Sequence, residues 1–201
     1  MNIPYAQESG AQKLDLYYPN EETAHFLPLF IFMAADFYEI RRMISARHSN
    51  LTKAGYVVAS CNYRLTGEAY FLAMVYDTKA ATRFINVATS TIWTQTNLLR
   101  RSIAGGYLSS CWRPRGKRNI RRLSQGNPDI SSKAQACIDW FGVVEFELQE
   151  EQLRRNGNSF KFSNVDSSVT DMFLSKVQDD NKEMKQEANI LAILPSLCCQ
   201  R

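Results

Sequence analysis

The sequence predicts an α/β fold, in which a mostly parallel sheet carries helices on both faces. Apolar runs of strand length alternate along the chain with longer stretches of helical periodicity. The helical stretches are long enough for crossover connections, which join parallel strands. The chain has 201 residues, of which 45% are hydrophobic, and no internal repeat, so we expect a single domain over residues 1–201.

The expected strands differ in their hydrophobic patterns. Residues Gln12–Tyr18 alternate polar and apolar side chains before Pro19-Asn20, which is typical of an edge strand followed by a turn. The continuous apolar runs Leu27–Met33 and Tyr56–Cys61 predict strands that are buried on both faces. Ala134–Phe141 predicts another strand, which Gly142 ends.

Two helices are expected between these strands. Residues Tyr38–Lys53 place apolar side chains at helical spacing among basic ones, and Gly55 follows as a stop signal. Residues Phe71–Ala88 carry an apolar stripe with a period of 3.6, which predicts a long helix. From Asp166 onward the chain is polar and helix-prone.

Charge and cysteine content argue against several classes of function. The net charge is only +4, and residues Arg100–Arg122 hold eight basic side chains and no acidic one. Because charge runs are usually solvated surface, we do not expect a nucleic-acid partner. The five cysteines are odd in number and contain no C-x-x-C pair, which argues against a zinc site or a disulfide framework. We expect no metal, no organic cofactor and a reducing compartment.

The sequence gives no sign of a membrane span or a secretion signal. No apolar run reaches the roughly 18 to 20 residues that cross a bilayer. The N-terminus lacks the basic and apolar regions of a signal peptide, which favours a cytoplasmic chain. Only 9 glycines and 2 histidines are present, so a hydrolytic site built from glycine-rich turns and a histidine base has little material.

Several stretches of the chain carry a family resemblance. They follow one another in the order GYVVASCNYRLTGEAYF (Gly55–Phe71), the helix that contains DTKAATRF (Asp77–Phe84), Ala104-Gly105-Gly106 and GNPDISSKAQACIDWFG (Gly126–Gly142). Together with YAQESGAQKLDLYYP (Tyr5–Pro19), they resemble the esterase/lipase branch of the α/β-hydrolase superfamily, and most nearly the acetyl-esterases and feruloyl-esterase-like proteins. The resemblance runs from about Ile3 to Ile193 and implies a serine carboxylic-ester hydrolase fold.

In that family a nucleophilic serine sits on a sharp strand-to-helix turn with the pattern G-x-S-x-G. Ala104, Gly105 and Gly106 match the residues after the nucleophile, which puts Ile103 at the nucleophile position and Arg101 at the first glycine. Ile103 carries no nucleophilic atom. Ser102 is displaced by one residue and is the only hydroxyl candidate at the elbow, although a helix cap or a turn serine also suits that position.

The family's H-G-G-G oxyanion loop corresponds to four residues after the Leu27–Met33 run: Met33, Ala34, Ala35 and Asp36. Without glycine, close approach of the backbone to an anion is disfavoured. A carboxylate at Asp36 would also oppose a developing oxyanion. The resemblance therefore implies a loop that no longer stabilises a tetrahedral intermediate.

Neither histidine falls at a family catalytic position, and His25 and His48 are expected on the surface. Asp139 matches a family position, but we expect it in a strand-end hydrogen bond, and Glu68 in a loop-ordering role. We expect the chain to lack the C-terminal strands that would carry the catalytic base and acid, so that the hydrolase domain is incomplete. The sequence thus predicts a hydrolase-like chain that is inactive as written.

Other interpretations remain open. The former cleft could bind a small acyl-ester ligand without turnover, and a sheet edge left uncovered could take a protein partner or a second copy of the chain. A truncated or degenerate gene product would show the same departures. The substrate and the oligomeric state are not predicted.

Overall fold

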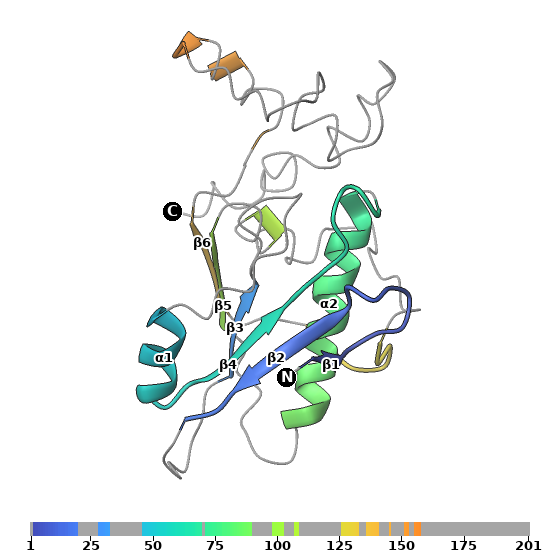
Figure 1. Ribbon diagram of the computed structural model, residues 1–201, viewed down its shortest axis with the longest axis vertical. Coiled ribbons are helices and arrows are strands. Elements are labelled where there is room, and N and C mark those ends of the chain that lie inside the picture. The colour runs from blue at the N-terminus through green and yellow to red at the C-terminus, as the bar shows by residue number, and fades with distance from the viewer. Residues whose placement is uncertain are drawn as a thin grey trace, which may run out of the picture.

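The computed structural model describes residues 2–19, 28–32, 46–69, 71–89, 98–102, 107–108, 126–132, 136–140, 145, 151–152 and 155–157. Within this part of the chain, six strands form one sheet in the order β1-β2-β4-β3-β5-β6 (Figure 1). Three neighbouring pairs are parallel and two are antiparallel, so the described sheet is mixed. No helix described is both long and apolar enough to cross a membrane.

The first predicted strand is present, but it does not lie at the sheet edge. β2 (Lys13–Tyr17) pairs antiparallel with β4 on one side and with β1 (Ile3–Pro4) on the other. The edge assignment was wrong because β1 has only two residues, one of them a proline, and leaves no alternating pattern in the sequence. Asp15 is also buried, so the polar positions of β2 do not all face solvent.

The centre of the sheet contains a βαβ unit. β3 (Pro28–Phe32) and β4 (Val57–Cys61) are parallel neighbours, with Pro28 opposite Val57 and Phe32 opposite Cys61. α1 (Ala46–Lys53) connects them, and residues 38–45 of its predicted range lie outside the described residues. The predicted helix stop is confirmed, because Gly55 has a φ of 87° and the last turn closes with two bonds, Gly55 N–H to Thr52 O and Tyr56 N–H to Leu51 O.

The long helix is also confirmed, as α2 (Phe71–Thr89). It packs on the face of the sheet where Leu14 stands opposite Cys61, and Leu16 opposite Ala59. Ala80, Ala81 and Ile85 are its contributions to this buried cluster. The small alanine side chains allow the helix axis to come close to the strands, and Figure 1 shows α2 running behind β1 and β2.

β5 (Leu98–Ser102) and β6 (Ala136–Trp140) extend the sheet beyond β3 in parallel. β6 confirms the strand expected in Ala134–Phe141, whereas residues 166–201 and their predicted helix lie outside the described residues. The basic residues Arg100 and Arg101 are part of β5, so the first part of the basic run belongs to the sheet. β5 was not predicted, because its two arginines interrupt the apolar pattern that indicates a buried strand.

The segment 126–132 lies along α2. The Asn86 side-chain amide donates to Ser131 O at 2.7 Å. Gly126 has a φ of 64°, and a Cβ added there would lie 3.3 Å from the Ala80 Cβ. The chain therefore needs a glycine at this position both for its backbone conformation and for its close approach to the helix.

Candidate functional site

The connections of the sheet reverse direction beside β3. From β3 the chain crosses to β4 on one side, and from β4 it crosses through α2 to β5 on the other side of β3. In open α/β sheets, ligands bind at the carboxyl ends of the strands at such a reversal. We call the carboxyl ends of β3 and β5, Phe32 and Ser102, the switch-point edge.

The strand register brings two predicted site segments to this edge. Ile31 of β3 stands opposite Arg100 of β5, so the two neighbouring strands end side by side. The predicted oxyanion positions 33–36 follow β3 directly, and the predicted elbow positions 103–106 follow β5 directly. Both segments lie outside the described residues. Their starting points are nevertheless adjacent, which is the placement that an oxyanion loop and a nucleophile turn require.

Ser102 is the last residue of β5 and stands opposite Trp140 of β6. It therefore lies within a strand ladder, and the residues of the expected elbow that follow it, 103–106, lie outside the described residues. Tyr107 and Leu108 are helical and fully buried. The nucleophile turn between them stays a prediction.

The other candidate residues are scattered. Asp139 lies in β6 opposite Arg101, and His48 lies in the first turn of α1. His25 lies outside the described residues. The backbone therefore places Asp139 and Ser102 on neighbouring strands near one sheet edge, while His48 belongs to a connecting helix.

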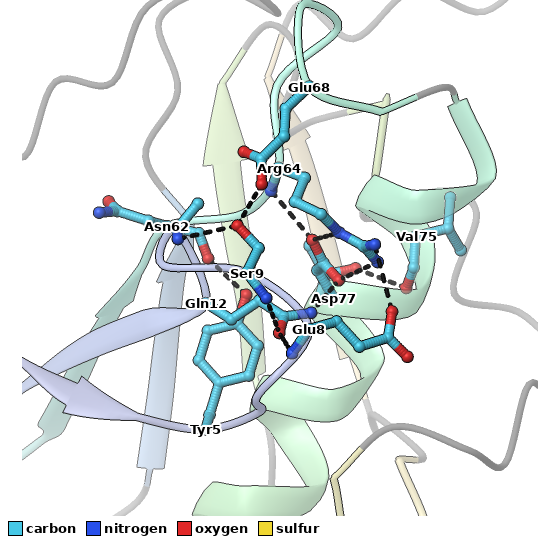
Figure 2. Close-up of polar contacts among 11 residues, drawn as sticks. Tyr5, Glu8, Ser9, Gln12, Asn62, Arg64, Glu68, Val75 and Asp77 are labelled. Atoms are coloured by element: carbon cyan, nitrogen blue, oxygen red, sulfur yellow. Dashed lines mark hydrogen bonds and ion pairs between the residues drawn. The ribbon is translucent and has the colours of Figure 1, made fainter.

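The best-defined polar group in the structure surrounds the carboxylate of Asp77 (Figure 2). Asp77 lies on α2 and is fully buried, and both of its oxygens accept hydrogen bonds. Oδ1 accepts from Gln12 Nε2 at 2.7 Å and from Arg64 Nη2 at 2.7 Å. Oδ2 accepts from the Arg64 backbone N–H at 2.9 Å and from Arg64 Nε at 3.0 Å. Such a set of donors replaces the hydrogen bonds to water that a carboxylate loses when it is buried.

Arg64 connects this carboxylate to the surface. Its side chain is 13% exposed, and Nη1 lies 3.2 Å from Glu8 Oε2, a partly exposed carboxylate in the β1–β2 turn. The hydrogen bond to Asp77 raises the pKa of Arg64, partly offset by burial. The guanidinium is therefore a fixed positive charge. We call Glu8, Gln12, Arg64 and Asp77 the Asp77 network.

Two further side-chain contacts join the β1–β2 turn to the segment that follows β4. The buried Tyr5 hydroxyl donates to Asn62 O at 2.6 Å, and the Ser9 hydroxyl donates to Glu68. Gln12 Oε1 accepts from the backbone N–H groups of Glu8 and Ser9 at 2.7 and 3.1 Å. The contact of Glu68 agrees with the loop-ordering role expected for it. Together with the bonds of Asp77, these contacts join the β1–β2 turn, the segment after β4 and α2.

Sequence analysis assigned no role to Asp77 or Arg64, although both lie in the stretches that carry the resemblance. One signal was available. Asp77 stands three and four positions before Ala80 and Ala81, which places a carboxylate on the buried side of an apolar helix. Such a residue needs a cationic partner, and Arg64 follows the preceding strand.

The Asp77 network holds three segments of the fold together, and each oxygen of its carboxylate already accepts two hydrogen bonds. Among the described residues, no group of three or more histidine, cysteine, aspartate or glutamate side chains could hold a metal ion. The switch-point edge, by contrast, is where ligand chemistry is expected. The fold and this edge together define a class, the α/β proteins that bind ligands at the carboxyl ends of their strands.

A family model narrows the class. The BD-FAE model matches residues 14–193, and this chain belongs to that family. The match includes β2 from Leu14 onward, the strands β3 to β6, and the helices α1 and α2. It confirms the resemblance to the esterase branch of the α/β-hydrolase superfamily, and no curated protein matches the sequence.

Solved structures share the fold. A truncated carbohydrate esterase from gut microbiota aligns with a TM-score of 0.72 at 24% identity, over 96% of this chain and 70% of its own. A bifunctional GH43-CE protein of Bacteroides eggerthii aligns with a TM-score of 0.70 at 24% identity, over 96% of this chain and 26% of its own. The thermophilic esterase Est2 of Thermogutta terrifontis aligns with a TM-score of 0.67 at 16% identity, over 96% and 65%. This chain therefore spans between about a quarter and 70% of the length of these proteins.

Proposed function

We propose that this chain is an esterase-like member of its family that no longer hydrolyses esters, and that it forms one α/β-hydrolase-like domain with helices on both faces of a mostly parallel sheet. The observation that carries the proposal is the end of β5. Ser102 is still paired in the sheet with Trp140, so the first residue free to form the nucleophile turn is Ile103. An isoleucine side chain has no atom that can attack an acyl carbon.

The segment after β3 supports the same conclusion. Oxyanion stabilisation needs backbone N–H groups aimed at the developing charge in a water-excluded site. Here the sequence after β3 is Met33-Ala34-Ala35-Asp36, which has no glycine and ends in a carboxylate. Loss of the nucleophile alone costs about 10⁶ in kcat for a serine hydrolase, and a defective oxyanion loop lowers the residual rate further.

Hydrolysis of p-nitrophenyl acetate and p-nitrophenyl butyrate by the purified chain tests the proposal. The initial rate should equal that of a Ser102→Ala variant at the same protein concentration, and both should follow the slow background of surface side chains. Ser102→Ala is a suitable control because it removes the nearest hydroxyl to the elbow. Turnover by the wild-type chain well above that of this variant would contradict the proposal.

Binding without turnover is the second candidate function. It is supported by the unequal distribution of the departures, which fall at the elbow and the oxyanion positions while the sheet order and the Asp77 network are intact. A small acyl ester is the expected ligand. Methyl butyrate titrated into the chain and followed by ligand-observed NMR should give saturable binding, and a signal that stays linear with ester concentration would contradict this function.

A further inference from the structure

The sequence contains one Asn-Gly pair, Asn156-Gly157, and the structure describes the turn that the pair forms. Arg155 before it is helical, and the Asn156 N–H donates to Gln152 O at 3.0 Å, which closes the helical turn. Gly157 follows with a φ of 69°, the left-handed conformation in which a glycine commonly ends a helix. The pair therefore lies at a helix end, drawn in orange at the top of Figure 1.

This helix end is open to solvent. Asn156 and Gly157 are both exposed, and a Cβ added at Gly157 would meet no heavy atom within 4 Å. Neither the Asn156 side chain nor the Gly157 N–H is bonded to another residue of the described part of the chain. Because a terminal helical turn opens at a free-energy cost close to zero, the backbone of Asn156 can leave its helical conformation without disturbing the rest of the fold.

We propose that Asn156 is a site of spontaneous deamidation in the folded chain. Asparagine is among the thermally labile residues. The nitrogen of Gly157 attacks Cγ of the Asn156 side chain, a new C–N bond closes a succinimide ring, and the side-chain nitrogen leaves as ammonia with the proton from the Gly157 N–H. Water then opens the ring at either carbonyl and gives aspartate or isoaspartate. Glycine favours the attack because it has no Cβ to shield its nitrogen.

The reaction adds a negative charge beside Arg155. The guanidinium of Arg155 is paired with Glu151, so the product places a second carboxylate next to this ion pair. A negative charge at the C-terminal end of a helical turn is unfavourable, because the helix dipole is negative there. Isoaspartate also lengthens the backbone by one carbon atom. We therefore expect a more acidic form of the chain, with the formal net charge of +4 at pH 7 lowered by one, in which the turn after Glu151 is loosened.

The test follows the purified chain during storage at mildly alkaline pH. Samples are digested with pepsin at acidic pH, where the reaction stops, and peptides that contain Asn156 are compared with synthetic aspartate and isoaspartate standards by chromatography and mass spectrometry. Fragment ions assign the product to Asn156 rather than to Asn158. A peptide of residues 151–161, stored alongside, gives the rate without the fold. We expect the rate in the folded chain to lie within about tenfold of the peptide rate, as for a fraying helix end.

Asn50 is the matched control within the same protein. It is also exposed, but it lies inside α1 and precedes Leu51, whose side chain shields the peptide nitrogen, so no product should form there over the same period. Two variants test the chemistry. Asn156→Gln should lose both products, because the longer side chain does not close the same ring. Gly157→Ala should form them more slowly, and the open space around this position should leave the thermal melt unchanged.

Three outcomes would overturn the proposal. A rate in the folded chain more than tenfold below that of the peptide would show that the fold holds the turn closed. Equal conversion of Asn50 and Asn156 would show that the glycine turn does not direct the reaction. Conversion of Gly157→Ala as fast as the wild-type chain would show that attack by an unshielded nitrogen is not the limiting step. The proposal does not rest on the proposed function, and ester turnover changes none of these measurements.

Discussion

The Arg64 guanidinium donates two hydrogen bonds to the carboxylate of Asp77 in a bidentate arrangement, from Nε to Oδ2 at 3.0 Å and from Nη2 to Oδ1 at 2.7 Å. The pair joins the end of β4 to the second turn of α2 across 13 positions of sequence. The Asp77 side chain is fully buried, so loss of this partner would leave a buried group without its cation. The same carboxylate also holds Gln12, which makes the pair a common anchor for the β1–β2 turn, β4 and α2.

The first prediction concerns the stability that this pair provides. Arg64→Ala leaves a buried carboxylate without its cation and should lower the free energy of unfolding by about 3 to 5 kcal/mol. Urea denaturation followed by circular dichroism measures the loss. The matched control is Arg155→Ala, because Arg155 pairs with Glu151 while 74% exposed. That variant should lose no more than about 0.5 kcal/mol, and equal losses in the two variants would contradict the assignment.

The second prediction compares two glycines. Gly126→Ala forces a φ of 64° on an L-residue and brings its Cβ to 3.3 Å from the Ala80 Cβ, so it should destabilise the fold by about 1 to 2 kcal/mol. Gly10→Ala is the control, since an added Cβ there meets nothing within 4 Å. It should be neutral or slightly stabilising. Thermal melts of both variants give the comparison, and a Gly126→Ala protein as stable as Gly10→Ala would show that the segment is not held against α2.

The third prediction concerns alkaline pH. Burial raises the pKa of the Tyr5 phenol well above its ordinary value of 10.0, with further contributions from Cys61 and Asp77. The folded chain therefore keeps the proton at a pH at which the unfolded chain has lost it. The contribution of Tyr5 to stability is fully present below pH 10 and declines as the pH rises above it. This decline should continue up to the raised pKa of the folded state.

A Tyr5→Phe variant isolates that effect. It loses the bond to Asn62 O, which should cost about 1 kcal/mol at neutral pH. Because phenylalanine does not ionise, the difference between the two proteins should shrink as the pH rises above 10. Urea midpoints at pH 7, 9, 10 and 11 provide the measurement. A constant difference across this range would show that Tyr5 is not held as a neutral phenol.

Most of the sheet could be predicted from hydrophobic pattern, and its exceptions have physical causes. The runs that became β3 and β4 are continuous and apolar because these strands lie inside the sheet. β1 has two residues and β5 contains two arginines, so neither produces the pattern of a buried strand. The position of β2 inside the sheet followed from the missed β1 and could not be read from its own alternation.

The candidate site could be predicted only in part. A family resemblance assigned the elbow and the oxyanion segment to residues next to strands, and both assignments stay predictions because those residues lie outside the described part of the chain. The Asp77 network was missed because its members come from three segments that approach one another only in the folded chain. The spacing of Asp77 to Ala80 and Ala81 indicated a buried carboxylate, but the sequence does not show which cation it meets. The pairing with Arg64 and Gln12 depends on how β2, the chain after β4 and α2 pack together.

The last prediction concerns repair of the elbow. Ile103→Ser restores a hydroxyl at the position that follows β5, but a serine becomes a nucleophile only when a neighbouring base takes its proton. The chain has two histidines, His25 and His48, and we expect neither at a family catalytic position. Ile103→Ser should therefore remain unlabelled by a fluorophosphonate probe that modifies activated serines, just as the wild-type chain should. Labelling of Ile103→Ser, abolished in a combined Ile103→Ser and His48→Ala variant, would identify His48 as a base and contradict the proposed lack of ester hydrolysis.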